Sequence, residues 1–340
     1  MSQVQLSEMG QESGGQRTPL LTINNLKVYF KKVTGTFVRK TTFVKAVDDV
    51  SIQMHKSEVL CLVGESGSGK TTIARCVAAL QRPTSGTIMF ENQNVTNLRG
   101  KNLKNYRRQV QIIFQDPFES LYSRFDVFTT IATPITELTG THNRFELREM
   151  VSSLLTEVGL NPAEYMHRLP HQLSGGERQR ISIARALAPS PKMLVADEPI
   201  TMLDASQRLN ILSILMQLKE KRNLSILLIT HDLASARLVS DNAAVLYRGK
   251  LVELGATDVM LSTPHHPYTN LILESTPDID APVKESKSPT GTIEEGEYVT
   301  RGCVFRPRCM YATSICEEEE PALLEKSTKH LAACHHPLNT

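Results

Sequence analysis

The feature that most constrains the fold of this chain is a glycine-rich turn between an apolar run and a helix-like segment. The run Val59–Val63 leads into Gly64-Glu65-Ser66-Gly67-Ser68-Gly69-Lys70-Thr71, which is followed by Thr72-Ile73-Ala74-Arg75. This order matches G-x-x-x-x-G-K-[ST] in its required context of strand, then helix. Backbone N–H groups of such a turn, with the helix N-terminus behind them, bind phosphate oxygens. A tight turn that binds nothing is the alternative, and the flanking segments disfavour it. The predicted phosphate-site residues are Gly64, Glu65, Ser66, Gly67, Ser68, Gly69, Lys70, Thr71 and Thr72.

Length and charge limit the function classes. The chain has 340 residues, of which 40% are hydrophobic, enough for one large or two modest domains. Its formal net charge of +2 excludes a strong overall attraction to nucleic acid or to anionic membranes. No apolar run approaches the roughly 18 residues of a membrane span. Residues 1–19 lack the apolar segment of a secretory signal, so we expect a disordered tail there.

Two acids end a second apolar strand. Met193–Ala196 leads into Asp197 and Glu198. Charges at the end of a buried strand cost free energy unless they are paired or hold a metal. Asp197 fits an acid on the Mg²⁺ side of a phosphate site, and Glu198 fits a carboxylate that orients or deprotonates water. Capping of the strand at the surface is the structural alternative.

A glycine pair opens a later helix. Leu173-Ser174-Gly175-Gly176-Glu177 precedes the helical run 178–188. Ser174 and Glu177 have the spacing of a capping box, which satisfies free N–H groups at a helix start. Gly175 and Gly176 suit the close approach of a bulky anion to the backbone. We expect a cap and an anion site together.

The remaining pattern alternates between strands and helices. Leu20–Phe30 and Lys45–Met54 alternate as strands, and the helical signal from Gln115 to about Leu169 predicts an inserted helical subdomain over residues 116–172. Phe30, with Tyr29 second, is the candidate to stack on an adenine ring, and a plain strand-face role is equally open. Further strands are expected at 87–90, 110–114, 225–230, 243–247 and 250–254, and a helix from Leu203 with Leu209, Leu212, Leu215 and Leu218 on its apolar face.

Together the motifs resemble the nucleotide-binding subunit of ABC transporters over residues 20–255. The order and spacing agree for Gly64–Thr71, Gln115, Leu173–Glu177, Met193–Glu198, Leu203-Asp204 and His231. The resemblance implies an α/β fold: a P-loop (RecA-like) ABC ATPase core with an antiparallel β subdomain and an inserted helical subdomain. Within the family the chain is similar to the dipeptide/oligopeptide (peptide/nickel) importer ATPases, through Gly64–Lys70, Phe114–Pro117 and Pro267–Thr269. Phe118 and the long insertion after the first strand resemble the second of two non-identical ATPase subunits.

The same resemblance implies roles for the site residues. Two subunits would pair head to tail, so that Leu173–Glu177 acts in trans on ATP bound to the partner, beside the D-loop residues Leu203 and Asp204. Thr71, Gln115 and Asp197 would bind or sense Mg²⁺. Glu198 would activate water and His231 would contact the γ-phosphate.

The implied partners are a second ABC ATPase subunit, two transmembrane permease subunits and, indirectly, an extracytoplasmic solute-binding protein, with no nucleic acid. The implied location is peripheral, on the cytoplasmic face of the cell membrane. A soluble ABC ATPase acting on ribosomes, DNA or iron–sulfur assembly is the alternative, and the single ATPase half and compact insertion disfavour it.

The six cysteines form two groups. Cys61 and Cys76 flank the phosphate loop and are expected in the core. The other four belong to a C-terminal extension over residues 256–340, after a linker at 276–297, and predict a metal over 303–334 rather than disulfides. Their wide spacing favours a [4Fe–4S] cluster, then zinc, then no metal. The four cysteines of the extension are Cys303, Cys309, Cys316 and Cys334. His265, His266, His335 and His336 are expected at the surface and not as ligands.

Overall fold

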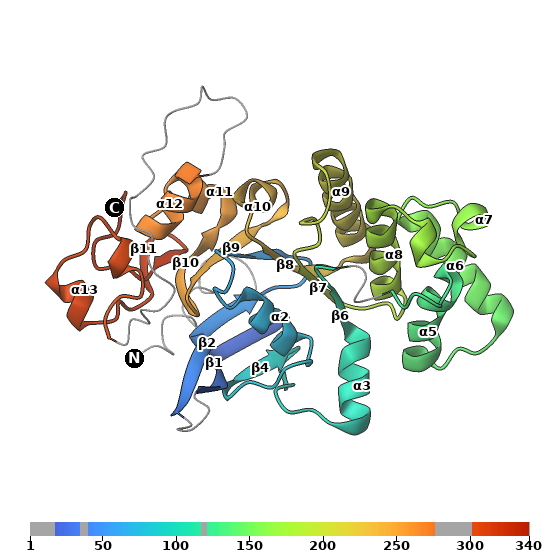
Figure 1. The fold of residues 1–340 in the computed structure, drawn as a ribbon, viewed down its shortest axis with the longest axis horizontal. Coiled ribbons are helices and arrows are strands. Elements are labelled where there is room, and N and C mark those ends of the chain that lie inside the picture. The colour runs from blue at the N-terminus through green and yellow to red at the C-terminus, as the bar shows by residue number, and fades with distance from the viewer. Residues whose placement is uncertain (1–17, 35–39, 117–120, 276–300, 340) are drawn as a thin grey trace.

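The computed structural model describes residues 18–34, 40–116, 121–275 and 301–339, which form two sheets with helices on both sides of the larger one (Figure 1). Most of the expected N-terminal tail, the expected linker at 276–297, and the family-specific Pro117 and Phe118 lie outside the described residues.

The larger sheet has the order β11-β12-β10-β9-β3-β8-β7-β6. Its centre is parallel, as expected where helices connect successive strands, while β10, β12 and β11 are added antiparallel at one edge. The C-terminal segment therefore extends the sheet that contains β3, the strand before the glycine-rich loop. The strands are β3 (Val59–Val63), β6 (Val110–Ile113), β7 (Met193–Asp197), β8 (Ser225–Thr230), β9 (Asn242–Tyr247), β10 (Lys250–Ala256), β11 (Leu324–Ser327) and β12 (His330–Ala332).

The smaller sheet is antiparallel, with the order β2-β1-β4-β5. Its first two strands are longer than the sequence pattern predicts, because the pairing of β1 with β2 continues outward to Thr34 and Lys40. The strands are β1 (Leu21–Thr34), β2 (Lys40–Met54), β4 (Ser85–Phe90) and β5 (Gln93–Asn94).

The central strand β3 belongs to two hydrophobic cores, because successive side chains of a strand point to opposite faces. Leu60 and Leu62 pack with the smaller sheet and with α2 (Lys70–Val77). Val59, Cys61 and Val63 pack with the helices on the other face. Every residue of the strand is therefore buried, which fixes the base of the turn that follows it.

The helical lobe on the right of Figure 1 lies within the range for which the sequence predicts helices. It contains α5 (Val127–Thr139), α6 (Arg144–Glu157) and α7 (Pro162–Tyr165), followed by η1 (Pro170–Gln172). The other helices are α3 (Gly100–Gln109), α8 (Gly175–Leu187), α9 (Ala205–Arg222), α10 (Leu233–Val239), α11 (Thr257–Ser262), α12 (Pro267–Ser275), η2 (Arg306–Arg308) and α13 (Ser314–Glu318).

The prediction for Leu209 in the apolar face of α9 is wrong. Leu212, Leu215 and Leu218 are buried, but the side chain of Leu209 is 59% exposed. A strict spacing of three residues drifts away from the helical period of 3.6, so the first leucine of the series has rotated off the buried face. Ile211 takes its place in the core.

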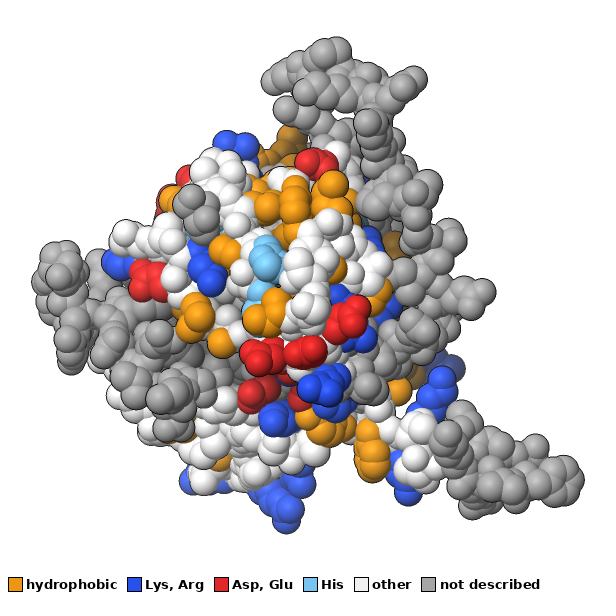
Figure 2. Space-filling view, turned by 90° about the vertical axis from the view of Figure 1, so that its left-hand side faces the viewer, with side chains coloured by type: hydrophobic (Ala, Val, Ile, Leu, Met, Phe, Trp, Pro, Cys, Tyr) orange, Lys and Arg blue, Asp and Glu red, His pale blue; other side chains and the backbone are white. Residues whose placement is uncertain are grey.

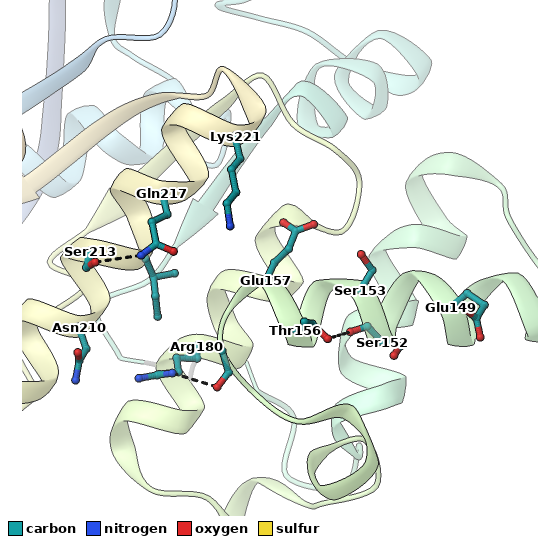
Figure 3. Close-up of a pocket in the computed structure, with 12 residues that line it drawn as sticks. Glu149, Ser152, Ser153, Thr156, Glu157, Arg180, Asn210, Ser213, Gln217 and Lys221 are labelled. Carbon is teal, nitrogen blue, oxygen red and sulfur yellow. Dashed lines mark hydrogen bonds between the residues drawn. The ribbon is translucent and has the colours of Figure 1, made fainter.

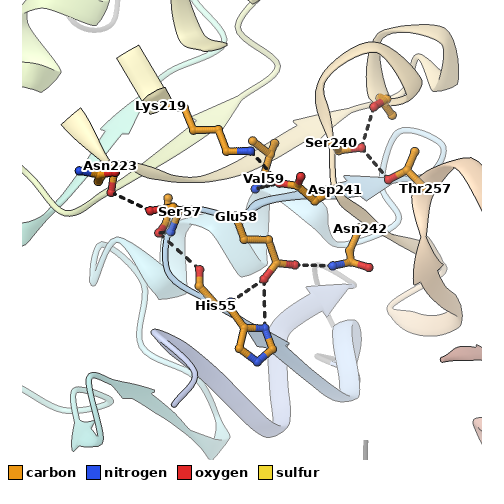
Figure 4. A network of polar contacts seen from close by, with 12 residues as sticks. His55, Ser57, Glu58, Val59, Lys219, Asn223, Ser240, Asp241, Asn242 and Thr257 are labelled. Atoms are coloured by element: carbon orange, nitrogen blue, oxygen red, sulfur yellow. Dashed lines mark hydrogen bonds and ion pairs between the residues drawn. The ribbon is translucent and has the colours of Figure 1, made fainter. Parts of the chain in front are cut away.

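A polar network lies at the starts of the neighbouring central strands β3 and β9 (Figure 4). The Glu58 carboxylate accepts hydrogen bonds from the backbone N–H of His55 and, at 2.7 Å, from the Asn242 amide. The Asp241 carboxylate accepts from the backbone N–H of Val59 at 2.7 Å and pairs with Lys219 at 2.9 Å. These contacts tie the start of β3 to the start of β9.

One of the contacts that attach the C-terminal extension to the core is a buried carboxylate. Glu253 of β10 accepts hydrogen bonds from the backbone N–H groups of His265 and His266 at 2.7 and 3.0 Å, and its Oε1 lies 2.7 Å from Nε2 of His330. His265 and His266 are each only 1% exposed, so their expected surface position is wrong. The Glu253 carboxylate accounts for their burial, because a buried acceptor needs hydrogen-bond donors and the backbone N–H groups of both histidines supply them. Acidic and basic side chains adjoin on this side of the molecule (Figure 2), and Lys250 pairs with Asp48 at 3.3 Å and with Glu320 at 2.6 Å.

Burial lowers the pKa of His266 from its ordinary value of 6.5 to about 4. The unfolded chain therefore binds more protons than the folded chain between these values, and stability is lost as the pH falls from about 6.5 towards 4. We expect the unfolding free energy in urea to be about 2 kcal/mol lower at pH 5 than at pH 7 on account of this residue. His266→Asn, which keeps an acceptor for the Tyr268 N–H, should lose that part of the pH dependence. An equal change in unfolding free energy between pH 7 and pH 5 in both proteins would contradict the assignment of this pH dependence to His266.

Candidate functional site

The sequence-predicted phosphate site lies in a cleft of about 1480 Å³ between the smaller sheet and the ends of β3, β7 and β8. The cleft brings together residues that are far apart in the sequence, namely the glycine-rich loop, Gln115, Glu198 and His231. Its lining residues are Lys32, Thr42, Phe43, Val44, Lys45, Ala46, Gly64, Glu65, Ser66, Gly67, Gly69, Lys70, Thr71, Thr72, Gln115, Glu198, His231, Arg248 and Ile272.

The loop at the base of this cleft needs glycine at two positions. Gly64 has φ +151°, and a Cβ there would lie 2.1 Å from the backbone O of Leu246. Gly69 has φ +104°, and a Cβ there would lie 2.3 Å from the backbone O of Ala46. Both glycines are thus pressed against neighbouring backbone, which only a residue without a side chain allows. The loop is held in shape by strands on either side of it.

Lys70 is folded back onto this loop. Its Nζ donates to the backbone O atoms of Gly64 and Glu65 at 2.6 and 2.8 Å and to Oγ of Ser68 at 3.3 Å. Burial lowers the pKa of the Lys70 ammonium, and the nearby carboxylates of Glu198 and Asp197 oppose that shift. A buried cation with carbonyl partners inside a nest of backbone N–H groups is suited to exchange those carbonyls for phosphate oxygens.

Thr71 and Asp197 form the candidate Mg²⁺ site. The Thr71 hydroxyl donates to Oδ1 of Asp197 at 3.0 Å. Burial, with the neighbouring Glu198 charge, raises the pKa of Asp197. A hydroxyl and a carboxylate are the hard oxygen ligands that Mg²⁺ takes when substrate phosphates complete its shell. The residues present therefore fit the ion.

Glu198 is positioned by three side chains. Its Oε2 accepts from Gln115 Nε2 at 3.0 Å and from the Thr201 hydroxyl at 3.0 Å, and lies 3.5 Å from Nδ1 of His231. The backbone of Glu198 is in the left-handed region, with φ +46°, a conformation that non-glycine residues adopt mainly where the surroundings enforce it. The side chain is thereby directed at Gln115 and His231. The sequence did not identify Thr201 as a site residue, because the only sequence signal for its contact with Glu198 is the spacing of three residues.

The aromatic residue in the cleft is Phe43. Phe30 and Tyr29, the sequence candidates for adenine stacking, are not among the described residues that line the cleft, and the Tyr29 hydroxyl is bonded to Asp48. Phe43 lines it with a side chain that is 62% exposed. It lies opposite Lys31 in the ladder, one position beyond the pair of Phe30 with Val44. No sequence pattern singles it out, because its place in the cleft depends on where the smaller sheet meets the glycine-rich loop.

The glycine pair lies at the N-terminus of α8, outside this cleft. The capping box is confirmed: the backbone N–H of Ser174 donates to Glu177 at 2.7 Å, and that of Glu177 donates to the Ser174 hydroxyl at 3.3 Å. None of Leu173–Glu177 is among the described residues that line the cleft. Asp204 caps α9, because its carboxylate accepts from the backbone N–H of Gln207 at 3.0 Å, and Leu203 is buried before it.

The metal predicted for the C-terminal cysteines finds no support in the structure. Burial raises the pKa of the Cys334 thiol, and the charges of Cys303, Cys309 and Cys316 raise it further. All four are free thiols. Within residues 18–34, 40–116, 121–275 and 301–339, no group of three or more His, Cys, Asp or Glu side chains is arranged to hold a metal ion. Cys61 and Cys76 are buried in the core as expected.

A second hollow, of about 650 Å³, lies between α6, α8 and α9 (Figure 3). Polar residues make up most of its lining, and Arg180 there donates to the backbone O of Val158 at 3.2 Å. Beside it, Arg222 of α9 holds Glu157 of α6 through bonds of 2.8 and 2.9 Å. The hollow contains none of the sequence-predicted site residues, and it lies where α6 of the helical lobe faces α8 and α9.

No helix in the described part of the chain is long and apolar enough to cross a membrane.

The chain matches two protein-family models. One, described as ABC transporter, covers residues 47–201, which contain the loop, the glycine pair and the two acids. The other, described as oligopeptide/dipeptide transporter, C-terminal region, covers residues 252–316 and so reaches three of the four clustered cysteines.

Curated relatives match along nearly the full chain. The oligopeptide transport ATP-binding protein AppF of Bacillus subtilis is 40% identical over 93% of this chain and 97% of its own length. The dipeptide transport ATP-binding protein DppF of Haemophilus influenzae is 37% identical over 94% and 98%. Among solved structures, the ATP-binding cassette MJ0796, in a dimeric post-hydrolysis state bound to ADP and Pi, superposes with a TM-score of 0.62 and 26% identity over 70% of this chain and 98% of that chain.

The position of Phe43 makes a testable prediction. Removing an aromatic ring that stacks on adenine costs about 1 kcal/mol, so Phe43→Ala should weaken binding of ATP about fivefold or more. Phe30→Ala, in the neighbouring register position, is the matched control and should change the Kd less than about twofold. Fluorescence titration with a labelled ATP measures both. A larger loss for Phe30→Ala would restore Phe30 as the stacking residue.

Proposed function

Because the chain belongs to the family of ATP-binding proteins of peptide ABC transporters, we propose that it is the ATP-hydrolysing subunit that energises an importer for peptides or related small solutes. The observation that carries the proposal is the cleft in which the loop, Gln115, Glu198 and His231 converge. Curated relatives named for oligopeptide and dipeptide transport support the substrate class. We assign the ATPase domain to residues 20–255 and the peptide-importer extension to residues 256–340.

In this proposal each residue acts on ATP from a fixed position. The loop N–H groups and Lys70 bind the β- and γ-phosphates, and Phe43 contacts the adenine. Thr71 and Asp197 would hold Mg²⁺ together with the phosphates, and the bound ion would supply positive charge near the transferred phosphoryl group. Glu198, held by Gln115 and Thr201, accepts a proton from the attacking water. His231 contacts the γ-phosphate beside it.

The proposed site is half of a composite one. The signature residues Leu173–Glu177 lie at the start of α8 and are not among the described residues that line the cleft, which supports a site completed by a second chain. A head-to-tail partner brings its own signature, with Ser174 and Gly176 presenting N–H groups to the γ-phosphate. The similar MJ0796 cassette is dimeric in its post-hydrolysis state, which supports such a pairing. ATP then joins the two subunits, and hydrolysis lets them separate.

The proposed partners follow from the family. Two transmembrane permease subunits couple to the ATPase pair, a solute-binding protein delivers the solute, and the second ATPase is a non-identical paralogue. The chain is then peripheral, on the cytoplasmic face of the membrane. The alternative function on ribosomes, DNA or iron–sulfur assembly is disfavoured, because the match to the oligopeptide/dipeptide transporter C-terminal region has no place in it.

We expect Glu198→Gln to bind ATP normally and to hydrolyse it at least about 10²-fold more slowly, the usual scale for the loss of a general base. Steady-state phosphate release from the purified importer complex measures the rate. Lys70→Ala is the companion variant, and it should lose tight ATP binding itself. An unchanged hydrolysis rate in Glu198→Gln would remove Glu198 from its assigned role.

We further propose that the four cysteines of the extension hold a metal, with an iron–sulfur cluster first and zinc second. The proposal rests on their sequence spacing and the nearness of their thiols, and no formed site supports it within the described residues. Anaerobically purified protein is expected to be brown and to lose iron in Cys303→Ser. Colourless protein with one equivalent of zinc would select the second metal, and protein with neither metal would end the proposal.

A further inference from the structure

Glu65, the second residue of the phosphate loop, is bound by two residues of the C-terminal extension. Nη1 of Arg308 lies 2.9 Å from each oxygen of the Glu65 carboxylate. The backbone N–H of Glu65 donates to the Tyr268 hydroxyl at 2.9 Å. These partners are 243 and 203 residues away in the sequence, so the fold brings them to the loop.

The two partners are themselves rigidly held. Tyr268 is fully buried, and its ring lies 4.6 Å from that of Tyr247 and 5.4 Å from that of Phe305, between ring centres. The Arg308 guanidinium lies 5.8 and 5.9 Å from the same two rings. Buried aromatic rings lose little further freedom when they make a contact, so they are suited to fix the position of a neighbouring loop.

Glu65 passes this constraint to the phosphate-binding lysine. While its N–H and carboxylate are held by the extension, its backbone O accepts from Lys70 Nζ at 2.8 Å. Every polar group of Glu65 therefore has a partner: its backbone O contacts Lys70, and its N–H and carboxylate contact the extension. The path from the extension to Lys70 has a single intervening residue.

The charge of Glu65 needs a partner in this position. Glu65 lines the ATP cleft, where a carboxylate without a counter-charge repels a triphosphate. Arg308 supplies that counter-charge from behind the loop. An exposed ion pair by itself contributes little to stability, so its value here lies in where it sets the loop and in what it neutralises.

We propose that Arg308 and Tyr268 of the C-terminal extension are positioning residues for ATP, which hold the phosphate loop through Glu65 and offset its charge. This inference rests on the proposed function of the cleft. By linkage, ATP binding stabilises the docked extension by the same factor by which docking strengthens ATP binding. The extension is thus a part of the nucleotide site and not only a tail attached to it.

The test is a double-mutant cycle on the full chain. Calorimetry measures the Kd of a non-hydrolysable ATP analogue in the presence of Mg²⁺. Arg308→Met keeps an aliphatic stem, removes the guanidinium charge, and is expected to weaken binding about fivefold or more in the wild-type background. In the Glu65→Gln background the same change should cost less than about twofold, since no carboxylate charge is left to offset. Tyr268→Phe should weaken binding about threefold with its ring packing intact.

Arg306→Met is the matched control. Arg306 lies two residues away in the same 3₁₀ turn, but its Nη1 bonds the backbone O atoms of Arg301 and Glu317 inside the extension, at 2.8 and 3.0 Å. It should bind the analogue within about twofold of wild type. Arg308→Lys, which keeps the charge, should recover part of the affinity.

Three results would overturn the proposal. Wild-type affinity in Arg308→Met would mean that the contact has no effect on the nucleotide. An equal loss for Arg308→Met in both Glu65 backgrounds would mean that Arg308 contacts the ligand directly. An equal loss in Arg306→Met would assign the effect to the fold of the extension. Failure of the wild-type chain to bind the analogue would instead reject the ATP site itself.

Discussion

The close approach of two backbones to the phosphate loop is the constraint on which the rest of the structure depends. Gly64 lies against the backbone O of Leu246 and Gly69 against that of Ala46, so a strand from each sheet sets the shape of the loop. Any fold that keeps these contacts must hold the smaller sheet beside the end of β9. The positions of Lys70, Thr71 and the cleft above them follow from that arrangement.

The C-terminal extension contacts both the larger sheet and the phosphate loop. Its strands β11 and β12 continue the sheet that begins at the phosphate site, and the buried Glu253 joins it to β10. Through Tyr268 and Arg308 it then reaches the loop from behind. A segment whose sequence pattern indicates a separate metal-binding tail therefore contacts the loop that lines the cleft.

The sequence predicted the elements that carry a local pattern. The loop, the strand before the two acids and the capping box of Ser174 and Glu177 are where their spacing placed them. What it could not predict depends on partners that are distant in the sequence. Phe43, and not Phe30, lines the cleft where the smaller sheet meets the loop, and His265 and His266 are buried with their backbone N–H groups bonded to Glu253. The contacts of Arg308 and Thr201 have no periodic signal at all.

We propose that one chain holds only half of a working ATP site. This can be tested by the ATP hydrolysis rate per chain, compared between the isolated protein and the complex assembled with its permease and partner ATPase, at an ATP concentration that saturates both. We expect the isolated chain to bind ATP but to turn it over at least about tenfold more slowly than the assembled complex. Equal rates per chain, independent of protein concentration, would show instead that the cleft is complete by itself.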